Sequence, residues 1–323
     1  MQSYWMNTST ATAEVELRTM PMPEPGPRQL LLRVRAAALN RGEFIIGHGL
    51  TKAGGTRALG IEGAGEVVGA GADATRFAVG DRVMGRFAGA MSEYALVNET
   101  DVLPVPPRLS WEEAAAIPVT YMVAHDMLVT QGHLPAGGWL LVTGVASGVG
   151  VASFQIGRAL GAKVIGTSGS QAKLDRLRLI GLDVALLTRS ANFFDAVMQA
   201  TAGAGVDVAV NAVGGAMFAE CMRSLAFQGR LATVGYLDGV LDAKVDLQAL
   251  HARRLVLFGV SNKMVGEAQR AGMTARFGED VLPAIADGRI RPLLDRVFPF
   301  GQVAAAKTYM ESDSHLGKIV VSI

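Results

Sequence analysis

The sequence has few of the residues that stabilise small secreted domains or bind nucleic acid. Its 323 residues include a single cysteine, Cys221, which excludes an internal disulfide and a thiolate-based structural zinc site. Lys and Arg total 30 against 29 Asp and Glu, so the formal charge of +1 offers no cationic surface to nucleic acid or to an anionic membrane. These absences predict a cytoplasmic protein that binds neither partner.

A membrane span and a signal peptide are not expected either. The mean hydropathy is +0.30, and an uncharged stretch runs from Leu134 to Gly157. Glycines and Pro135 divide this stretch into short apolar blocks, which suits a buried strand, a turn and a helix better than a lipid-facing helix. No Lys or Arg precedes Arg18 and no apolar run follows Met1, so we expect no signal peptide.

The length and a change of pattern along the chain predict two domains. Near the N-terminus, a period of two places Leu30, Leu32 and Val34 on one face and Arg33 and Arg35 on the other, which indicates a half-buried strand of an antiparallel domain. Strand-like and helix-like blocks alternate from about residue 120, which predicts a doubly wound parallel sheet with helices on both faces. The predicted divisions are 1–119, 120–261 and 262–323, with the last segment returning to the first domain.

The predicted elements of the middle region are short and regularly spaced. The strands are expected at 139–143, 163–167, 184–187, 206–211, 229–234 and 256–260. The helices are expected at 149–160, 171–180, 193–202 and 217–225. Before this region, Ser110 and Glu113 form a capping-box pattern that opens a short helix, which Pro118 is expected to close.

A glycine-rich turn follows the strand predicted at 139–143. Gly144, Gly148 and Gly150 lie between this strand and the next helix, where small residues allow backbone amides to approach a pyrophosphate. A strict G-x-G-x-x-G pattern fails because Val145 and Ser147 stand where two glycines would be. The alternative interpretation is that these glycines only pack the helix against the strand. We expect a dinucleotide site because the strand–turn–helix–strand unit is complete.

The next strand distinguishes the two nicotinamide cofactors. NAD sites carry an acidic residue about 20 residues past the turn, which holds the ribose 2′-hydroxyl. Here the strand ends in Thr167, Ser168 and Gly169, and the cations Lys173 and Arg189 follow. Hydroxyl donors and cations suit an anionic 2′-phosphate, so the sequence predicts NADPH. A solvated helix charge is the alternative interpretation of Lys173.

Several blocks together resemble the medium-chain dehydrogenase/reductase superfamily, in its zinc-independent branch of quinone oxidoreductases and enoyl reductases. The blocks lie in family order over the whole chain, at 38–43, 60–69, 79–83, 92–95, 143–150 and 317–320. The resemblance implies a GroES-like β-barrel catalytic domain formed by both chain ends, a Rossmann domain in the middle and a homodimer joined by edge strands near 256–260. Asn40 and Ile61 stand where zinc-dependent relatives carry metal ligands, which implies an enzyme that uses no metal.

Without a metal, hydride transfer requires a small-molecule acceptor that is already electrophilic, such as a quinone or an α,β-unsaturated carbonyl. The catalytic candidates are Asn40, by resemblance, and Tyr236, which follows the end of a predicted strand. Among other possible proton donors, Tyr121 and His125 are expected to pack in a helix and Tyr94 in the β-domain. The alternative function is a non-catalytic NADPH-binding scaffold of the same fold.

The predicted cofactor-binding residues come from the turn, from the ends of the neighbouring strands and from the two chain ends. They are Asn40, Thr143, Gly144, Ala146, Ser147, Gly148, Val149, Gly150, Thr167, Ser168, Gly169, Lys173, Arg189, Asn211, Val213, Gly235, Tyr236, Phe258, Gly259, Val260 and Lys318.

Overall fold

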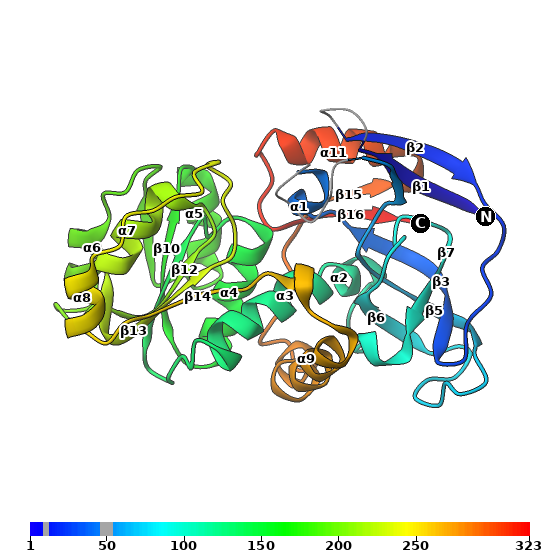
Figure 1. The fold of residues 1–323 in the computed structure, drawn as a ribbon, viewed down its shortest axis with the longest axis horizontal. Helices are drawn as coiled ribbons and strands as arrows, with labels where there is room; N and C mark the ends of the chain where they lie inside the picture. The colour runs from blue at the N-terminus through cyan, green and yellow to red at the C-terminus, as the bar shows by residue number, and fades with distance from the viewer. Residues whose placement is uncertain (9–12, 46–53) are drawn as a thin grey trace. The chain divides into compact units, whose positions relative to one another are not determined.

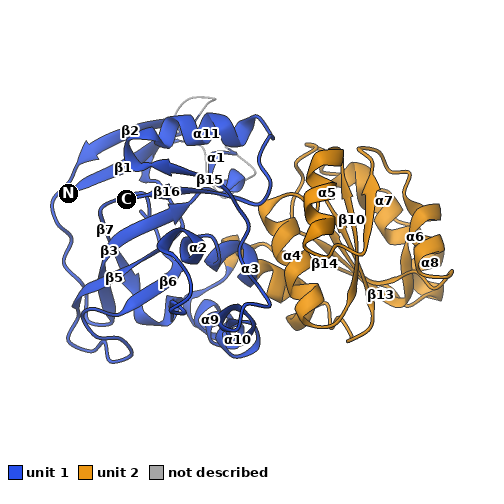
Figure 2. Ribbon diagram, turned by 180° about the vertical axis from the view of Figure 1, so that it is seen from behind, with its two compact units in different colours: residues 1–122, 265–323 blue, residues 123–264 orange. Residues whose placement is uncertain are grey.

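The computed structural model describes residues 1–8, 13–45 and 54–323. The chain forms two compact units (Figures 1 and 2). Unit 1 contains residues 1–122 and 265–323, and unit 2 contains residues 123–264. Unit 1 is therefore built from both ends of the chain. No helix in the described part of the chain is both long and apolar enough to cross a membrane.

A seven-stranded sheet forms the centre of unit 1. Six strands follow the order β15-β16-β3-β5-β6-β8, and β7 pairs with β3. All neighbours are antiparallel except β15 and β16. The strands are β3 (Gln29–Ala38), β5 (Glu62–Ala70), β6 (Arg82–Arg86), β7 (Tyr94–Asn98), β8 (Val102–Pro104), β15 (Leu294–Pro299) and β16 (Lys318–Ser322).

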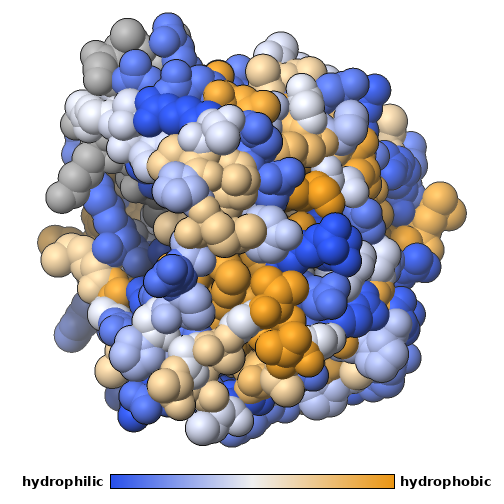
Figure 3. All heavy atoms as spheres, turned by 90° about the vertical axis from the view of Figure 1, so that its right-hand side faces the viewer, coloured by the Kyte–Doolittle hydropathy of each residue, from blue (hydrophilic) through white to orange (hydrophobic). Residues whose placement is uncertain are grey.

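The alternating pattern near the N-terminus forms the strand that the sequence predicts. Leu30, Leu32 and Val34 in β3 are at most 2% exposed and belong to the core of unit 1, whereas Arg33 is exposed. Because side chains of a strand alternate between faces, this period places the leucines inside. In the face drawn in Figure 3, hydrophobic side chains lie among hydrophilic ones.

The remaining elements of unit 1 surround this sheet. A three-stranded sheet has the order β2-β1-β4, from β1 (Gln2–Asn7), β2 (Glu14–Thr19) and β4 (Thr56–Ala58). The helices of unit 1 are α1 (Arg41–Phe44), α2 (Trp111–Ala115), α9 (Glu267–Asp280), α10 (Leu282–Ala286) and α11 (Val303–Glu311), and α3 (Pro118–His125) runs from unit 1 into unit 2.

The capping box predicted at Ser110 is confirmed. The Ser110 hydroxyl accepts a hydrogen bond from the Glu113 backbone amide, and the Glu113 carboxylate accepts one from the Ser110 amide. The helix ends at Ala115, before the predicted stop at Pro118. Pro118 instead begins α3, which suits proline because the first amide of a helix has no helical acceptor.

Unit 2 contains a six-stranded parallel sheet with the order β11-β10-β9-β12-β13-β14. The order reverses between β9 and β12, which is the switch point where doubly wound sheets open a crevice for ligands. The strands are β9 (Trp139–Thr143), β10 (Lys163–Ser168), β11 (Val184–Leu187), β12 (Val206–Asn211), β13 (Leu225–Thr233) and β14 (Val256–Gly259). The predicted doubly wound α/β fold is confirmed.

The four predicted helices of unit 2 lie within two residues of their predicted bounds. They are α4 (Gly148–Ala159), α5 (Gln171–Leu179), α6 (Phe194–Ala200) and α7 (Gly215–Arg223). A further helix, α8 (Leu247–Ala252), was not predicted. The prediction was wrong at the end of α7, because Leu225 already begins β13 and pairs with Val206. Cys221 of α7 is buried in the core of this unit.

Candidate cofactor site and buried ion-pair site

The turn between β9 and α4 is held in one tight conformation. Gly144 adopts a φ of +63°, which favours glycine, and Ser147 caps α4 by accepting a hydrogen bond from the Gly150 amide at 3.1 Å. A Cβ atom at Gly150 would lie 2.7 Å from the Cα atom of Val145, so α4 approaches the turn too closely for any side chain there. The glycines therefore pack the helix and shape the turn at the same time.

The N-terminus of α4 has the chemistry that binds an anion. The Gly150 amide bonds Ser147 Oγ and the Val151 amide bonds the Ser147 carbonyl, so the helix itself provides no acceptors for the two preceding amides, Gly148 and Val149. These amides and the positive end of the helix dipole suit a pyrophosphate group. The N-terminus of α4 is therefore suited to bind the pyrophosphate of a dinucleotide.

A cationic group lies at the end of the neighbouring strand β10. The Thr188 amide bonds the Ser168 carbonyl at 3.0 Å, which places the chain after β11 beside the end of β10. A Cβ atom at Gly169 would lie 2.6 Å from Cζ of Arg189, so the Arg189 side chain crosses the Gly169 backbone. Within the described residues, the exposed guanidinium of Arg189 makes no hydrogen bond or ion pair. Lys173, half-buried, lies in the first turn of α5, three residues after its cap Ser170.

The side chains of Thr143 and Asn211, which were predicted to bind cofactor, form hydrogen bonds at the ends of β9 and β12. Both are fully buried, and Thr143 Oγ1 accepts a hydrogen bond from the Ala212 amide at 3.1 Å. Asn211 Oδ1 accepts from the amides of Val213 and Gly214, both at 3.1 Å. These two side chains therefore shape the turn after β12 and do not point into open space.

The other predicted residues of unit 2 lie at the same edge of its sheet. Thr167 Oγ1 accepts from the Gly144 amide at 3.3 Å, which joins the ends of β9 and β10. The backbone at Gly235 passes the Ala212 carbonyl, and Tyr236 beside it is 38% exposed. The ends of adjacent parallel strands bring together the residues Ala146, Ser147, Val213, Phe258, Gly259 and Val260 with this group.

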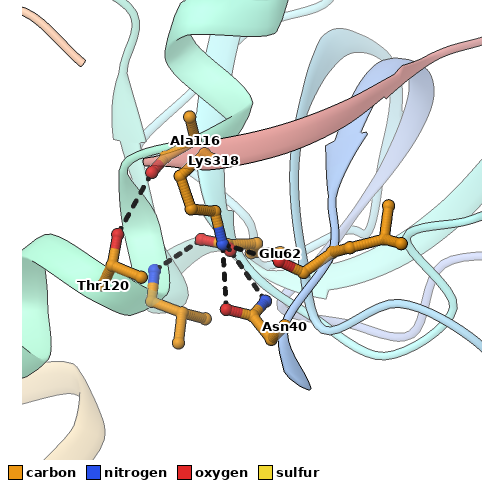
Figure 4. Close-up of polar contacts among 7 residues, drawn as sticks. Asn40, Glu62, Ala116, Thr120 and Lys318 are labelled. Atoms are coloured by element: carbon orange, nitrogen blue, oxygen red, sulfur yellow. Dashed lines mark hydrogen bonds and ion pairs between the residues drawn. The ribbon is translucent and has the colours of Figure 1, made fainter. Parts of the chain in front are cut away.

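The predicted residues of unit 1, Asn40 and Lys318, lie in a buried ion-pair site (Figure 4). Lys318 Nζ donates to Glu62 Oε1 at 2.6 Å and to Asn40 Oδ1 and the Leu39 carbonyl, both at 2.9 Å. The Lys318 side chain is 5% exposed and that of Glu62 is 0% exposed. All three ammonium hydrogens are therefore used inside unit 1.

Glu62 connects this site to α3. Its Oε1 atom also accepts from Asn40 Nδ2 at 2.8 Å, and its Oε2 atom accepts from the Val119 amide in the first turn of α3 at 2.7 Å. The positive end of a helix stabilises a carboxylate at this position. Asn40 is thus held at both ends of its amide, by a cation at the oxygen and an anion at the nitrogen.

A second buried carboxylate, Glu43, lies near this group. It is 1% exposed and accepts a hydrogen bond from the Gly60 amide at 3.1 Å. Burial raises the pKa of Glu43 to about 7, with Arg57 opposing the shift and Glu62 adding to it. The carboxyl group is therefore divided between its neutral and charged forms near neutral pH.

The remaining candidate proton donors occupy different environments. Tyr121 and His125 are 1% and 3% exposed in α3, as their expected packing role requires. Burial raises the pKa of Tyr121, which makes its hydroxyl a weaker acid. Tyr94 lies half-buried in β7 beside Arg33 of β3.

Among the described residues, no group of three or more His, Cys, Asp or Glu side chains is placed so that it could hold a metal ion.

Comparison with known proteins identifies the family of the chain. Residues 26–107 match the family model described as "Alcohol dehydrogenase GroES-like domain", and residues 180–321 match "Zinc-binding dehydrogenase". Together with the parallel sheet of unit 2 and the mainly antiparallel sheet that both chain ends form in unit 1, these matches define the class. The chain belongs to the medium-chain dehydrogenase/reductase superfamily, whose members are oxidoreductases.

Among curated proteins, the chain is 34% identical over 295 residues to the spectinabilin polyketide synthase system protein NorB of Streptomyces orinoci, covering 91% of this chain. It is 31% identical over 251 residues, or 77% of the chain, to the highly reducing polyketide synthase easB of Emericella nidulans. The chain spans only 13% and 10% of the lengths of these two relatives.

Solved structures cover nearly the whole chain. The CurK enoyl reductase matches with a TM-score of 0.84 and 25% identity over 99% of both chains. A mycobacterial protein complexed with NADPH matches with a TM-score of 0.88 and 25% identity over 100% of both chains. The fold is therefore that of oxidoreductases of this superfamily, enoyl reductases among them.

The sequence interpretation missed Glu62, although its motif was part of the resemblance. The available signal was the acidic residue that begins the small-residue strand Glu62–Ala70, because a charge in the buried part of a strand requires a partner. The partner, Lys318, lies 256 positions away in the chain. No local pattern indicates a pairing over that separation.

Proposed function

We propose that the protein is an NADPH-dependent, zinc-independent reductase of a quinone or an α,β-unsaturated carbonyl compound. The observation that carries the proposal is the site in unit 2, where an anion-binding helix terminus lies one strand away from the cations Lys173 and Arg189. When bound, the nicotinamide supplies a hydride to the acceptor. The solved relatives that are an enoyl reductase and an NADPH complex support this direction.

Different residues of the chain bind different parts of the cofactor. The amides of Gly148 and Val149 hold the pyrophosphate, and Ser168, Lys173 and Arg189 hold the 2′-phosphate. Asn40, fixed by Lys318 and Glu62, contacts the nicotinamide or the substrate. Lys318 serves as a positioning residue, because its hydrogen bonds go to protein atoms.

The acceptor chemistry follows from the residues at the metal positions. With Asn40 and Ile61 in place of metal ligands, the carbonyl of the substrate must accept negative charge without a Lewis acid. A conjugated carbonyl or a quinone meets this requirement, since charge arriving on carbon is delocalised to oxygen. Tyr236 at the end of β13 is the candidate donor of the proton that completes the reduction.

The quaternary arrangement and location are part of the same proposal. β14 is an edge strand of the unit 2 sheet, so two copies can extend the sheet by pairing there. We expect a homodimer in the cytoplasm, and size-exclusion chromatography with light scattering measures its mass.

The first experiment follows loss of NADPH absorbance in chelator-treated protein, with an ortho-quinone, a para-quinone and a simple enone as acceptors and NADH in parallel. Turnover that survives the chelator supports the proposal and identifies the acceptor class. NADPH binding without turnover of any acceptor would contradict it and favour the non-catalytic scaffold.

The second experiment separates the two cofactors. Lys173→Ala and Arg189→Ala are expected to weaken NADPH binding roughly tenfold each and leave NADH binding unchanged, because a charge-assisted bond to phosphate is lost. Arg178→Ala is the matched control, since Arg178 lies on the same helix as Lys173 but pairs with Asp175 at 2.9 Å. Equal losses for both cofactors would contradict the assignment.

A further inference from the structure

Arg86, the last residue of β6, lies beside the buried ion-pair site of unit 1. It is paired in register with Glu62 of the antiparallel strand β5. Side chains of directly opposed residues lie on the same face of a sheet. The Phe87 amide bonds the Ile61 carbonyl at 3.1 Å, so Glu62 and Arg86 form the adjacent non-hydrogen-bonded pair, in which side chains approach more closely.

The two carboxylates near Arg86 are already occupied by other groups. Glu62 accepts hydrogen bonds from Lys318, Asn40 and the Val119 amide. Both oxygens of Asp101 accept from Nε of Arg270 at 3.0 Å. Each carboxylate therefore forms a neutral pair with a cation other than Arg86.

Arg86 itself has no such partner in the part of the chain that the structure describes, where its guanidinium makes no hydrogen bond or ion pair. The contrast with Arg82 on the same strand is informative. Arg82 stacks over the ring of Trp111 at 4.3 Å and donates to the Leu109 carbonyl at 2.9 Å. Arg82 therefore has partners for part of its guanidinium, although its Nε atom has none, whereas the Arg86 guanidinium has no hydrogen-bond partner among the described residues.

The electrostatic surroundings of Arg86 favour an added anion. Burial lowers the pKa of Arg86, and the like charge of Arg270 lowers it further, while Asp101 and Glu62 oppose this shift. With the pairs Glu62–Lys318 and Asp101–Arg270 each neutral, the charge of Arg86 is the local excess. An anionic group at Arg86 would compensate that charge.

We propose that Arg86 binds an anionic group of the substrate, a carboxylate or a phosphate, and so selects negatively charged acceptors. This inference rests on the proposed reductase function and makes it more specific. Arg86 is a specificity-determining residue and takes no part in hydride transfer. A guanidinium suits this role because its planar donors match the oxygens of either group.

The test compares negatively charged acceptors with neutral analogues that carry the same reducible double bond. One pair is acetylacrylate and its methyl ester, and the other is crotonyl-CoA and the crotonyl thioester of N-acetylcysteamine. In the parent protein, kcat/KM is expected to favour the anionic member of at least one pair. Arg86→Leu is expected to lower kcat/KM for that member roughly tenfold or more, leaving the neutral member within about twofold.

Arg86→Lys and Arg289→Leu are the matched variants. Lysine keeps the charge and is expected to restore part of the preference. Arg289 is an exposed arginine of the same unit, paired with Asp287 at 2.9 Å, so its removal changes the net charge equally without affecting the preference. If Arg86→Leu loses the preference for acetylacrylate over its methyl ester, the group that Arg86 binds is a carboxylate. If it loses the preference for crotonyl-CoA over the N-acetylcysteamine thioester, the group is a phosphate.

Binding measured without turnover keeps this inference separate from the proposed function. Calorimetry with levulinate, the reduced form of acetylacrylate, and with coenzyme A is expected to give tighter binding to the parent than to Arg86→Leu. Equal kcat/KM ratios in parent and Arg86→Leu, or equal losses for charged and neutral acceptors, would overturn the inference while leaving the reductase intact. Failure to reduce any acceptor would overturn the proposed function, and the calorimetry would still decide whether Arg86 binds anions.

Discussion

Lys318 and Glu62 form an ion pair 2.6 Å long inside unit 1, with side chains 5% and 0% exposed. The pair joins the C-terminal strand β16 to β5, and Glu62 extends it to α3 through the Val119 amide. Removing two charges from water is costly, so a pair at this depth contributes to stability only while both partners are present. Its presence beside Asn40 fixes the orientation of that amide.

Lys318→Met is therefore expected to destabilise the protein by about 3–5 kcal/mol, because it leaves the Glu62 carboxylate buried without a cation. The double variant Glu62→Gln with Lys318→Met is expected to lose less than the sum of the single variants, since it leaves no buried charge. Urea denaturation of the four proteins measures the coupling. Additive losses would contradict a direct pair.

Glu43 predicts a pH dependence whose sign follows from its raised pKa. Below the ordinary value of 4.5 the carboxyl is neutral in both folded and unfolded chains. Between 4.5 and about 7 the unfolded chain releases the proton while the folded chain retains it, so stability falls as pH rises. The loss is about 3 kcal/mol across this window.

Glu43→Gln removes this titration and keeps an acceptor for the Gly60 amide. The difference in unfolding free energy between parent and variant is expected to change between pH 4.5 and about pH 7, with the parent losing stability relative to the variant as pH rises. Denaturation at several pH values measures it. A difference independent of pH would mean that Glu43 titrates normally.

The sequence predicts most of the fold because the signals that define it are local. The alternation of Leu30, Leu32 and Val34 and the strand blocks of unit 2 each depend on a few consecutive residues. The predicted end of α7 was wrong because a local pattern does not show strand pairing. Leu225 fits a helical pattern, but it pairs with Val206 and begins β13. Tertiary pairing decides such positions.

The site is predicted less completely because its contacts are distant in sequence. Gly144 and Gly150 follow a strand–turn–helix pattern and are found from it, but the role of Thr143 and Asn211 depends on contacts between β9 and β12. From the sequence, Arg86 looks like an ordinary charge at the end of a short strand. Only the occupation of Glu62 and Asp101 by other cations distinguishes it.

Gly150→Ala tests the close approach of α4 to its turn. The added Cβ would lie 2.7 Å from Cα of Val145, and backbone atoms there cannot rotate away. We expect a loss of about 1–3 kcal/mol in stability. NADPH affinity is expected to fall at least tenfold, because the amides that face the pyrophosphate move with the helix.

Gly272→Ala is the control for this substitution. Gly272 is exposed in α9, and a Cβ there would meet nothing within 4 Å, so alanine is expected to stabilise the protein by about 0.5–1 kcal/mol without changing cofactor affinity. Thermal unfolding and fluorescence titration with NADPH measure both quantities. Unchanged affinity in Gly150→Ala would show that the turn only packs the helix.

Gly169→Ala tests the position of Arg189 without removing its charge. The new Cβ would lie 2.6 Å from Cζ of Arg189, and because this side chain is long and exposed, it can swing aside at little cost to the fold. Stability is expected to change by less than about 0.5 kcal/mol. NADPH affinity is expected to fall several-fold while NADH affinity stays constant, because the guanidinium no longer faces the 2′-phosphate. Titration with both cofactors measures the ratio of NADPH affinity to NADH affinity. Combining Gly169→Ala with Arg189→Ala should cause no further loss of NADPH affinity, since the two changes remove the same contact. A fully additive double variant would place Arg189 outside the phosphate site.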